Sequence, residues 1–291
     1  MRADHLRTIL DARTTNPGAI ADAAARRQKP ASLLGPHGRL MMIAADHPAR
    51  GALGAGDRPM AMADRSDLLD RLCLALSRPG VNGVLGTPDI IEDLLLLGAL
   101  EGKVVVGSMN RGGLSGSVFE LDDRFTAYDA AAIATMGYEG GKMLLRIDAA
   151  DPASVRTIEA CGRAVSELAD RRVLAMIEPF LAHRVDRRVH NVLSADAMIR
   201  AVTVAAGLGT TSAHTWLKVP VVPEMARVMA ATTLPAVILG GEVSADPDAA
   251  FESWRGALAL PTVRGLVVGR SLLYPPDDDV ADAVDTAVSL F

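Results

Sequence analysis

The sequence predicts an α/β fold: a closed barrel of eight parallel strands alternating with helices, a (β/α)8 or TIM barrel, with a short N-terminal helical extension. The first observation is a set of eight short apolar runs, each followed by a turn and a helical pattern. The runs are rich in Val, Ile and Leu and apolar on both faces, as parallel strands buried under helices are. They lie at residues 40–46, 83–86, 103–109, 142–147, 173–178, 216–221, 236–241 and 265–270.

The second observation is that helix-start signals follow several of these runs. A capping residue precedes a proline suited to the first helical position at Thr87-Pro88, Asp151-Pro152 and Asp246-Pro247. Strand–helix alternation repeated eight times indicates a closed barrel. The main alternative, an open doubly wound sheet, usually carries a GxGxxG motif after an early strand, and the sequence has none.

The third observation is length. The chain has 291 residues, 49% of them hydrophobic, which suits one barrel of the usual size, near 250 residues, plus a small addition. Residues 1–36 precede the first run and are predicted to form an arm of two helices, the second beginning at Asn16-Pro17. Residues 37–291 are predicted to form the barrel. The arm would either cover the bottom of the barrel or join subunits.

Composition limits the possible partners. A net charge of −5 does not favour binding to nucleic acid or to an anionic membrane. The first residues are charged and unlike a signal peptide, and no apolar run reaches the roughly 18 residues of a membrane span. Cys73 and Cys161 have neither CxxC nor metal-ligand spacing, so we expect buried thiols and a cytoplasmic protein.

One apolar run carries a lysine in its middle, Lys218, within HTWLKVPVV at residues 214–222. Lysine and arginine together number 30, and only four of these are lysines: Lys29, Lys103, Lys142 and Lys218. Arginine cannot lose its proton and act as an amine nucleophile, whereas lysine can. A lysine in this chain is therefore predicted to do what arginine cannot. The structural alternative is pairing of Lys218 with a core carboxylate such as Asp46 or Glu178.

Residues at the carboxyl ends of barrel strands carry the chemistry in barrels of this kind. Those candidates are, in chain order, Asp46, Asn110, Arg111, Lys142, Arg146, Glu178, Lys218, Gly240, Gly241, Gly269 and Arg270. Lys142 and Arg146 share one face of their strand because they are four residues apart. Since Lys142 begins its predicted strand, it can alternatively point to the bottom of the barrel.

The last four candidates predict a phosphate site. Barrels often bind phosphate in the loops after strands seven and eight. Glycine lets the backbone approach an anion closely, and Arg270 would add charge-assisted hydrogen bonds. Either glycine turn alone would be an ordinary loop, but their joint placement favours phosphate.

Lys218 is predicted to form a Schiff base. Burial lowers the pKa of a strand lysine from about 10.4, and the neutral amine attacks a ketone or aldehyde. The resulting iminium draws electrons from the adjacent carbon–carbon bond, as an aldolase requires. Lys142, also on an even-numbered strand, would lower the pKa of Lys218 further. Glu178 would shuttle protons, and Asp46 would orient the lysine or take the hydroxyl proton.

These residues resemble a known family. KMLLRID, MIEPF, WLKVPV, the glycine pair at 240–241 and GLVVGR resemble the class I, metal-independent aldolases of the deoxyribose-phosphate aldolase superfamily. The nearest types are the bacterial tagatose-bisphosphate and archaeal-type fructose-bisphosphate aldolases, and IAADHPARG resembles the first strand of the latter. The resemblance covers roughly residues 37–291 and rests on the set of motifs in order.

The resemblance implies that Lys218 is the Schiff-base lysine, Glu178 the strand-five glutamate and Lys142 the strand-four lysine. It also implies phosphate binding by Gly240, Gly241, Gly269 and Arg270. Lys218 runs straight into Val219, where the tagatose group tends to carry an acidic residue, and the loops NRGGLSGS and HRVDRRVHN do not match. The substrate is therefore open; a phosphorylated keto-deoxy-gluconate of bacterial inositol breakdown is one candidate.

Three other functions are open. A metal-dependent aldolase or hydrolase would use His47, His183, His190 and His214, but their spacing matches no compact metal motif. A phosphosugar isomerase or epimerase would need only acid–base groups, and a non-catalytic barrel would bind a phosphosugar alone. The sequence favours a lyase that uses no metal or cofactor. Its expected partner is a small phosphorylated sugar or keto acid, and we also expect a homo-oligomer.

Overall fold

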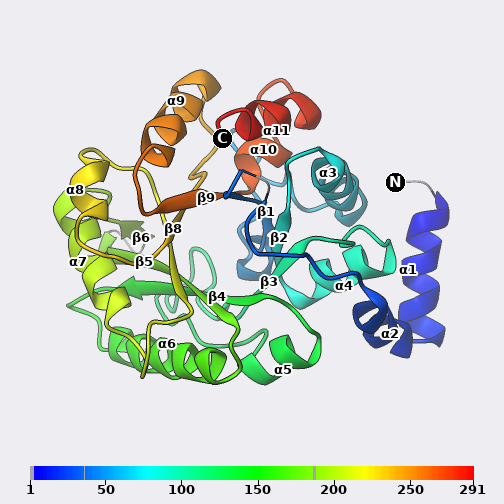
Figure 1. The fold of residues 1–291 in the computed structure, drawn as a ribbon, viewed down its shortest axis with the longest axis horizontal. Helices are drawn as coiled ribbons and strands as arrows, with labels where there is room; N and C mark the ends of the chain where they lie inside the picture. The colour runs from blue at the N-terminus through cyan, green and yellow to red at the C-terminus, as the bar shows by residue number, and fades with distance from the viewer. Residues whose placement is uncertain (1–2, 36, 186–187) are drawn as a thin grey trace.

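Eight parallel strands form a closed ring in the computed structural model, which describes residues 3–35, 37–185 and 188–291 (Figure 1). The strands follow one another in the hydrogen-bonded order β4-β3-β2-β1-β9-β8-β7-β5, and β4 also pairs with β5, which closes the ring. The fold is thus the predicted TIM barrel. Its strands are β1 (Leu40–Ala45), β2 (Gly83–Gly86), β3 (Val104–Ser108), β4 (Gly140–Ile147), β5 (Leu174–Val185), β7 (Thr215–Val219), β8 (Ala236–Leu239) and β9 (Val263–Val268).

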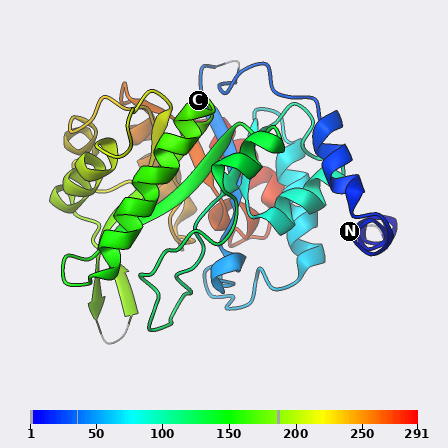
Figure 2. The same cartoon turned by 90° about the horizontal axis from the view of Figure 1, so that it is seen from below.

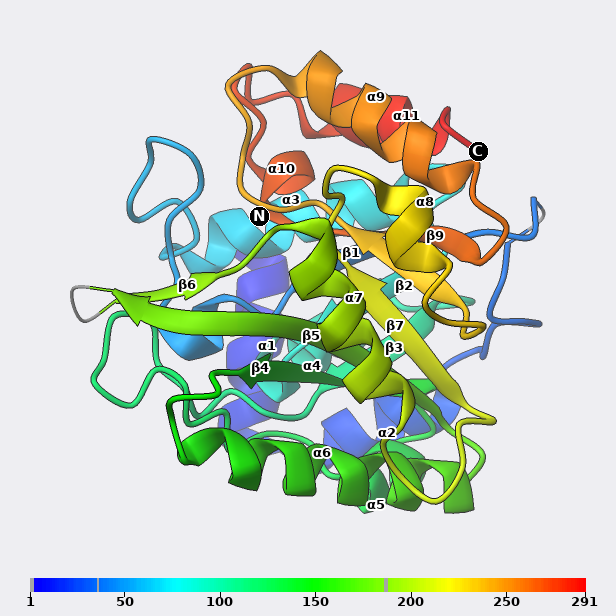
Figure 3. The same cartoon turned by 90° about the vertical axis from the view of Figure 1, so that its left-hand side faces the viewer.

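Helices between the strands cover the outside of the ring (Figures 1 and 3). They are α3 (Arg65–Ser77), α4 (Pro88–Leu96), α5 (Ala130–Thr135), α6 (Ala153–Asp170), α7 (Ala195–Ala206), α8 (Met225–Met229), α9 (Pro247–Leu258), α10 (Arg270–Leu273) and α11 (Val280–Val288). Side chains accept hydrogen bonds from backbone N–H groups at the starts of α3, α5, α7, α9 and α11, which explains why the helices begin there. Among the described residues no helix is long and apolar enough to cross a membrane. Cys161 is buried as predicted, whereas Cys73 is half-buried.

The barrel interior is apolar in its lower layers and polar above them. Strand side chains alternate between the two faces. On β3 this places Val104 and Val106 in the interior cluster, and the next position of the same face is Ser108. The same alternation on β5 places Met176 in the cluster and Glu178 above it. Polar side chains therefore gather at the carboxyl ends of the strands.

The fifth strand departs from the prediction, because it runs past Glu178 to Val185. Its last four residues, 182–185, pair antiparallel with β6 (Arg188–Asn191), so the loop predicted here is a hairpin. His183 and His190 face each other across this hairpin, with ring centroids 6.2 Å apart. The parallel partner β4 follows β5 as far as Leu181, and β6 pairs with the four residues beyond it. The hairpin projects beyond the barrel (Figure 3).

The N-terminal arm consists of two helices, α1 (Ala3–Thr15) and α2 (Gly18–Arg26), in the predicted places. They pack beside α4, on the side of the molecule away from the β5–β6 hairpin (Figures 1 and 2). Arg13 of α1 forms an ion pair with Asp93 of α4 at 2.8 Å. That this arm joins subunits stays a prediction.

Residues 27–34, between α2 and the first strand, lie under the barrel. Arg27 is buried and donates hydrogen bonds to the carbonyl of Lys103 at 2.7 Å and to Glu139 at 2.8 Å, just before β3 and β4. Leu33 and Leu34 pack against the interior cluster. The segment that links arm and barrel therefore closes the bottom of the barrel.

Candidate active site

The carboxyl ends of the strands surround a cavity of about 520 Å³. All but one of the predicted site residues line it: Asp46, Arg111, Lys142, Arg146, Glu178, Lys218, Gly240, Gly241, Gly269 and Arg270. Asn110 lies elsewhere, because its buried amide is bonded to the backbone N–H and C=O of Leu144, at 2.7 and 2.6 Å. Asn110 thus joins the loop after β3 to β4, and the structure does not place it where substrate would bind.

Four buried charged side chains form a chain of contacts at the floor of the cavity. The ammonium group of Lys218 lies 2.7 Å from Oε1 of Glu178. The ammonium group of Lys142 contacts the other oxygen of Glu178 and lies 3.1 Å from Oδ2 of Asp46. The residues come from four strands or strand ends, so the closed ring brings them together.

Strand register explains the position of Lys142. Strand β4 begins at Gly140, two residues before the predicted run, because Gly140 and Gly141 pair with both β3 and β5. Lys142 is therefore the third residue of the strand. Its ammonium group faces Glu178 and Asp46 in the cavity, which excludes the alternative that it points to the bottom of the barrel.

Burial and neighbouring charge shift the titration of this cluster. Burial would raise the pKa of Glu178, but the ammonium groups of Lys142 and Lys218 hold it well below its usual range. Burial likewise opposes ionisation of Asp46, yet Arg111 and Lys142 hold its pKa well below the usual value. Burial, together with the nearby Arg111, lowers the pKa of Lys142 to about 8. Lys142 therefore loses its proton about one pH unit above neutrality.

Asp46 is also held by two groups from the β3 region. Its Oδ2 accepts a hydrogen bond from Ser108 Oγ at 3.1 Å and lies 3.1 Å from Nη1 of Arg111. Ser108 was not predicted, although the inward alternation along VVVGS is a signal that would have found it. With Lys142, three donors surround one carboxylate oxygen.

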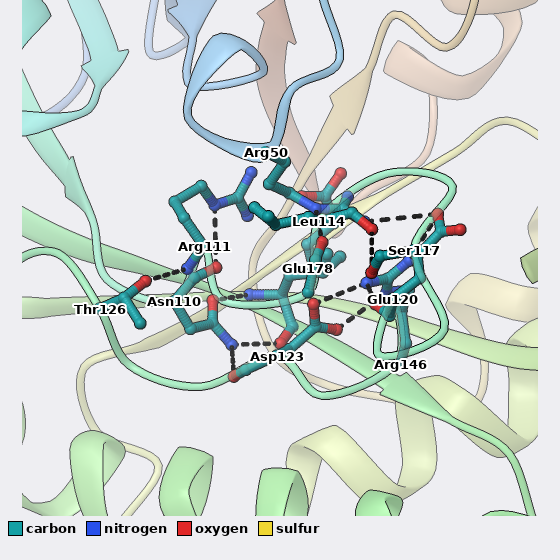
Figure 4. Close-up of polar contacts among 12 residues, drawn as sticks. Arg50, Asn110, Arg111, Leu114, Ser117, Glu120, Asp123, Thr126, Arg146 and Glu178 are labelled. Atoms are coloured by element: carbon teal, nitrogen blue, oxygen red, sulfur yellow. Dashed lines mark hydrogen bonds and ion pairs between the residues drawn. The ribbon is translucent and has the colours of Figure 1, made fainter.

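The loop after β3, residues 110–126, is anchored by a second charged network (Figure 4). Arg146 forms two hydrogen bonds to Asp123, at 2.8 and 2.7 Å, and lies 3.5 Å from Glu120. Arg50, from the turn η1 (Pro48–Arg50), donates to the carbonyl of Gly113 at 2.8 Å. Arg146 lines the cavity as predicted, but its guanidinium is bound to loop carboxylates.

Arg50 and Arg111 line the side of the cavity near this loop, and each also faces a carboxylate, Glu120 at 3.7 Å and Asp46 at 3.1 Å. Burial and the neighbouring Arg146 lower the pKa of Arg50 to about 10, so it is still protonated at neutral pH. Nη2 of Arg111 is buried and has no hydrogen-bond partner within the described part of the chain. Arg50 was not predicted, because its contacts with the loop join residues more than 60 positions apart.

The predicted phosphate loops also line the cavity. Gly269 is required by packing, since a Cβ there would lie 2.4 Å from the carbonyl oxygen of Ala44, and Gly241 has a φ of +72°, a conformation that favours glycine. Arg270 donates to Glu242 at 2.7 Å, and Glu242 is largely exposed. An anion entering this end of the cavity would compete with Glu242 for Arg270.

His47 follows Asp46 at the end of β1 and lines the same cavity. Its Nδ1 is buried and lies 3.7 Å from Oδ1 of Asp46, while 28% of its side chain is exposed. Burial, together with Arg270 and Lys218, lowers the pKa of His47 to about 3, so its imidazole is neutral at pH 7. Across residues 3–35, 37–185 and 188–291, no group of three or more His, Cys, Asp or Glu is arranged to hold a metal ion.

The fold is a TIM barrel, and solved aldolase structures share it. A Schiff-base-forming fructose-1,6-bisphosphate aldolase has a TM-score of 0.67 and 15% identity, with 93% of this chain and 99% of that chain covered. An archaeal fructose 1,6-bisphosphate aldolase has a TM-score of 0.66 and 15% identity, with 93% and 98% covered. At this identity the likeness shows the fold alone.

The chain belongs to the Cgl0159-like family, whose model matches residues 38–288. The crystal structure of Cgl0159 from Corynebacterium glutamicum has a TM-score of 0.97 and 52% identity, covering 100% of this chain and 97% of that chain. No curated protein matches this chain in sequence.

Proposed function

We propose that the protein is a class I aldolase, a lyase that cleaves or forms a carbon–carbon bond of a phosphorylated sugar or sugar acid through a Schiff base on Lys218, without a metal. The proposal rests on the structural environment of Lys218. It is a buried amine at the carboxyl end of a barrel strand, it lines the cavity, and it contacts a glutamate that a second buried lysine also contacts.

The cluster can supply the proton transfers that a Schiff base needs. Glu178 bridges the two ammonium groups, so a proton leaving Lys218 has an acceptor at 2.7 Å. Loss of a proton from Lys142, whose pKa is about 8, would leave Glu178 with one cation and make it a better acceptor. Neutral Lys218 then attacks the substrate carbonyl, and loss of water from the carbinolamine gives the iminium.

The two ends of the cavity fit a substrate with two anionic groups. The phosphate would bind Gly240, Gly241, Gly269 and Arg270, after β8 and β9. In the ring of eight strands, β3 and β4 lie opposite β8 and β9. Arg111, with its unpaired buried nitrogen, and Arg50 would hold the second anion, such as the carboxylate of a phosphorylated keto-deoxy-gluconate.

Structural neighbours support this chemistry. One archaeal fructose-1,6-bisphosphate aldolase was solved with its catalytic lysine covalently bound to the carbinolamine intermediate; its TM-score is 0.65 at 15% identity. The present cavity holds a buried lysine at the carboxyl end of a strand in the same kind of barrel. The phosphosugar isomerase reading lacks a comparable observation, since it leaves Lys218 without a chemical role.

Borohydride trapping tests the proposal. The protein is incubated with dihydroxyacetone phosphate and a panel of small carbonyl compounds, reduced with borohydride, and analysed by mass spectrometry. We expect an adduct on Lys218, and Lys218→Arg should abolish it because arginine keeps the charge but loses the amine. Lys103→Arg is the matched control, since Lys103 bonds the Val81 carbonyl away from the cavity. Absence of an adduct across the panel, with activity lost in EDTA, would overturn the proposal.

A further inference from the structure

We propose that His47 is the catalytic proton-transfer residue of the carbon–carbon bond step, with Nε2 taking the proton of the substrate hydroxyl. This inference rests on the proposed function, because it requires an iminium on Lys218. It assigns a role to a side chain that lines the cavity and that the lysine–carboxylate cluster does not use.

The two carboxylates of the cluster are poorly placed to act as this base. Oδ2 of Asp46 accepts from Lys142, Ser108 and Arg111. Both oxygens of Glu178 contact ammonium groups. A carboxylate held by several cations is a weak base, since protonation would break those contacts. His47 is a neutral group in the cavity, and it can accept a proton without breaking an ion pair.

The geometry of His47 leaves one ring nitrogen available. Nδ1 is buried, and the nearest carboxylate oxygen that the structure records beside it is Oδ1 of Asp46 at 3.7 Å. This neighbour favours the tautomer with the hydrogen on Nδ1. Because 28% of the side chain is exposed while Nδ1 is not, we assign Nε2 and its lone pair to the exposed part of the ring. The other histidine at the cavity, His190, is exposed on the hairpin rim.

The charged groups that face His47 make its basicity depend on substrate. Burial acts most strongly against the imidazolium form of His47, Arg270 and Lys218 add to this effect, and Asp46 and Glu178 act in favour of the imidazolium. A phosphate bound at Arg270 would offset the effect of that guanidinium and raise the proton affinity of His47 when substrate is present. The base would then be strongest in the complex in which it is needed.

The step balances with no further reactant. Nε2 of His47 accepts the hydroxyl proton, and the C–O bond becomes the carbonyl of the departing aldehyde. The electron pair of the breaking carbon–carbon bond moves into the iminium and gives the enamine. The imidazolium then returns the same proton to the enamine carbon, and water hydrolyses the new iminium to release the ketone and free Lys218.

Hydrogen exchange separates this role from Schiff-base formation. The wild-type protein, with dihydroxyacetone phosphate in D2O, should exchange the hydrogens of the hydroxymethyl carbon beside the carbonyl. His47→Gln places an amide near the Nε2 position and His47→Asn one near Nδ1, and neither can act as the base. We expect both variants to keep the Lys218 adduct and to lose exchange by about 100-fold or more. Added imidazole should restore exchange in His47→Ala.

Three results would contradict the inference in distinguishable ways. Exchange at the wild-type rate in folded His47→Gln and His47→Asn would show that another group moves the proton. Loss of the adduct along with exchange in both folded variants would place His47 in Schiff-base formation instead. Absence of a wild-type adduct across the carbonyl panel would overturn the proposed function itself. Thermal unfolding of each variant shows whether it is folded.

Discussion

Two buried charged regions lie side by side in this barrel and differ in one residue type. The floor of the cavity pairs Glu178 with two lysines and Asp46 with Lys142 and Arg111, whereas the loop after β3 pairs its carboxylates with arginines such as Arg146 and Arg50. Both regions place cations close to carboxylates. Only the lysines can lose a proton and become neutral amines.

The difference indicates that the arginine network fixes the loop after β3 and that the lysine cluster is suited to proton transfer. Arg146 holds Asp123 through two parallel hydrogen bonds, a rigid geometry that suits fixing a loop. Burial and Arg111 lower the pKa of Lys142 to about 8, which suits proton exchange. In a chain that otherwise prefers arginine, two of its four lysines lie together in the cavity.

Replacing Lys142 by arginine should have the largest effect, because it makes the cavity floor resemble the arginine network of the loop. Lys142→Arg keeps the charge beside Glu178 and Asp46 but removes the group that titrates near neutral pH. We expect borohydride trapping at Lys218 to slow by about 1000-fold at pH 7.5, because the proton acceptor chain is lost. Lys142→Met, without a charge, is the companion variant if the larger guanidinium prevents folding. Trapping at the wild-type rate in a folded variant would remove Lys142 from the proposed mechanism.

Asp123→Asn tests the arginine network that anchors the loop after β3. It leaves Arg146 buried without its two-fold partner, and breaking a buried pair costs about 3–5 kcal/mol. Urea unfolding should show this loss of stability, while the Lys218 adduct still forms. Asp122→Asn is the matched control, because Asp122 pairs with the exposed Arg124 and should change stability by at most about 1 kcal/mol. Equal stability of the two variants would contradict the scaffold role.

The pH dependence of trapping would sharpen the comparison. The pKa of Lys142 is about 8, below its usual value, so the residue loses its proton as pH rises through 8. Glu178 then has one cation fewer and accepts the proton of Lys218 more readily. The trapping rate should rise about tenfold per unit below pH 8 and level off above it. The inflection should be absent in Lys142→Arg; its persistence there would assign it to another group.

Glu242→Gln should have the smallest effect. Glu242 is exposed and occupies Arg270 at 2.7 Å. Removing its charge frees Arg270 for phosphate, but an exposed pair is worth at most about 1 kcal/mol, or about fivefold in affinity. Isothermal titration with inorganic phosphate should show tighter binding than the wild type. Weaker binding would mean that Glu242 positions Arg270 rather than competing for it.

The barrel could be predicted because its signals are local. Each strand is an apolar run followed by a helical segment, and side chains cap the starts of α3, α5, α7, α9 and α11. The candidate residues could be placed at the cavity because strand alternation and strand order fix which side chains point inward, as Lys142 and Glu178 do. The scarcity of lysine directed attention to Lys218 independently of the fold.

Other features depend on contacts between distant segments. Arg50 reaches the loop after β3, and the last four residues of β5 pair with β6. Asn110 follows a strand as a binding residue would, yet its amide bonds to the backbone of β4. His47 was considered only as a metal ligand, because the sequence does not show that the carboxylates beside it are already occupied. Such facts require the assembled cavity.

The packing of Leu33 and Leu34 under the barrel affects how substrate, water and products reach and leave the cavity. With the interior filled by apolar side chains and Leu33 and Leu34 packed beneath it, the cavity opens at the strand ends. Substrate, water and both products of the proposed cleavage would pass through this opening. A fragment still held there would keep water from the intermediate left on the enzyme. Product order would then be set by the architecture as much as by chemical reactivity.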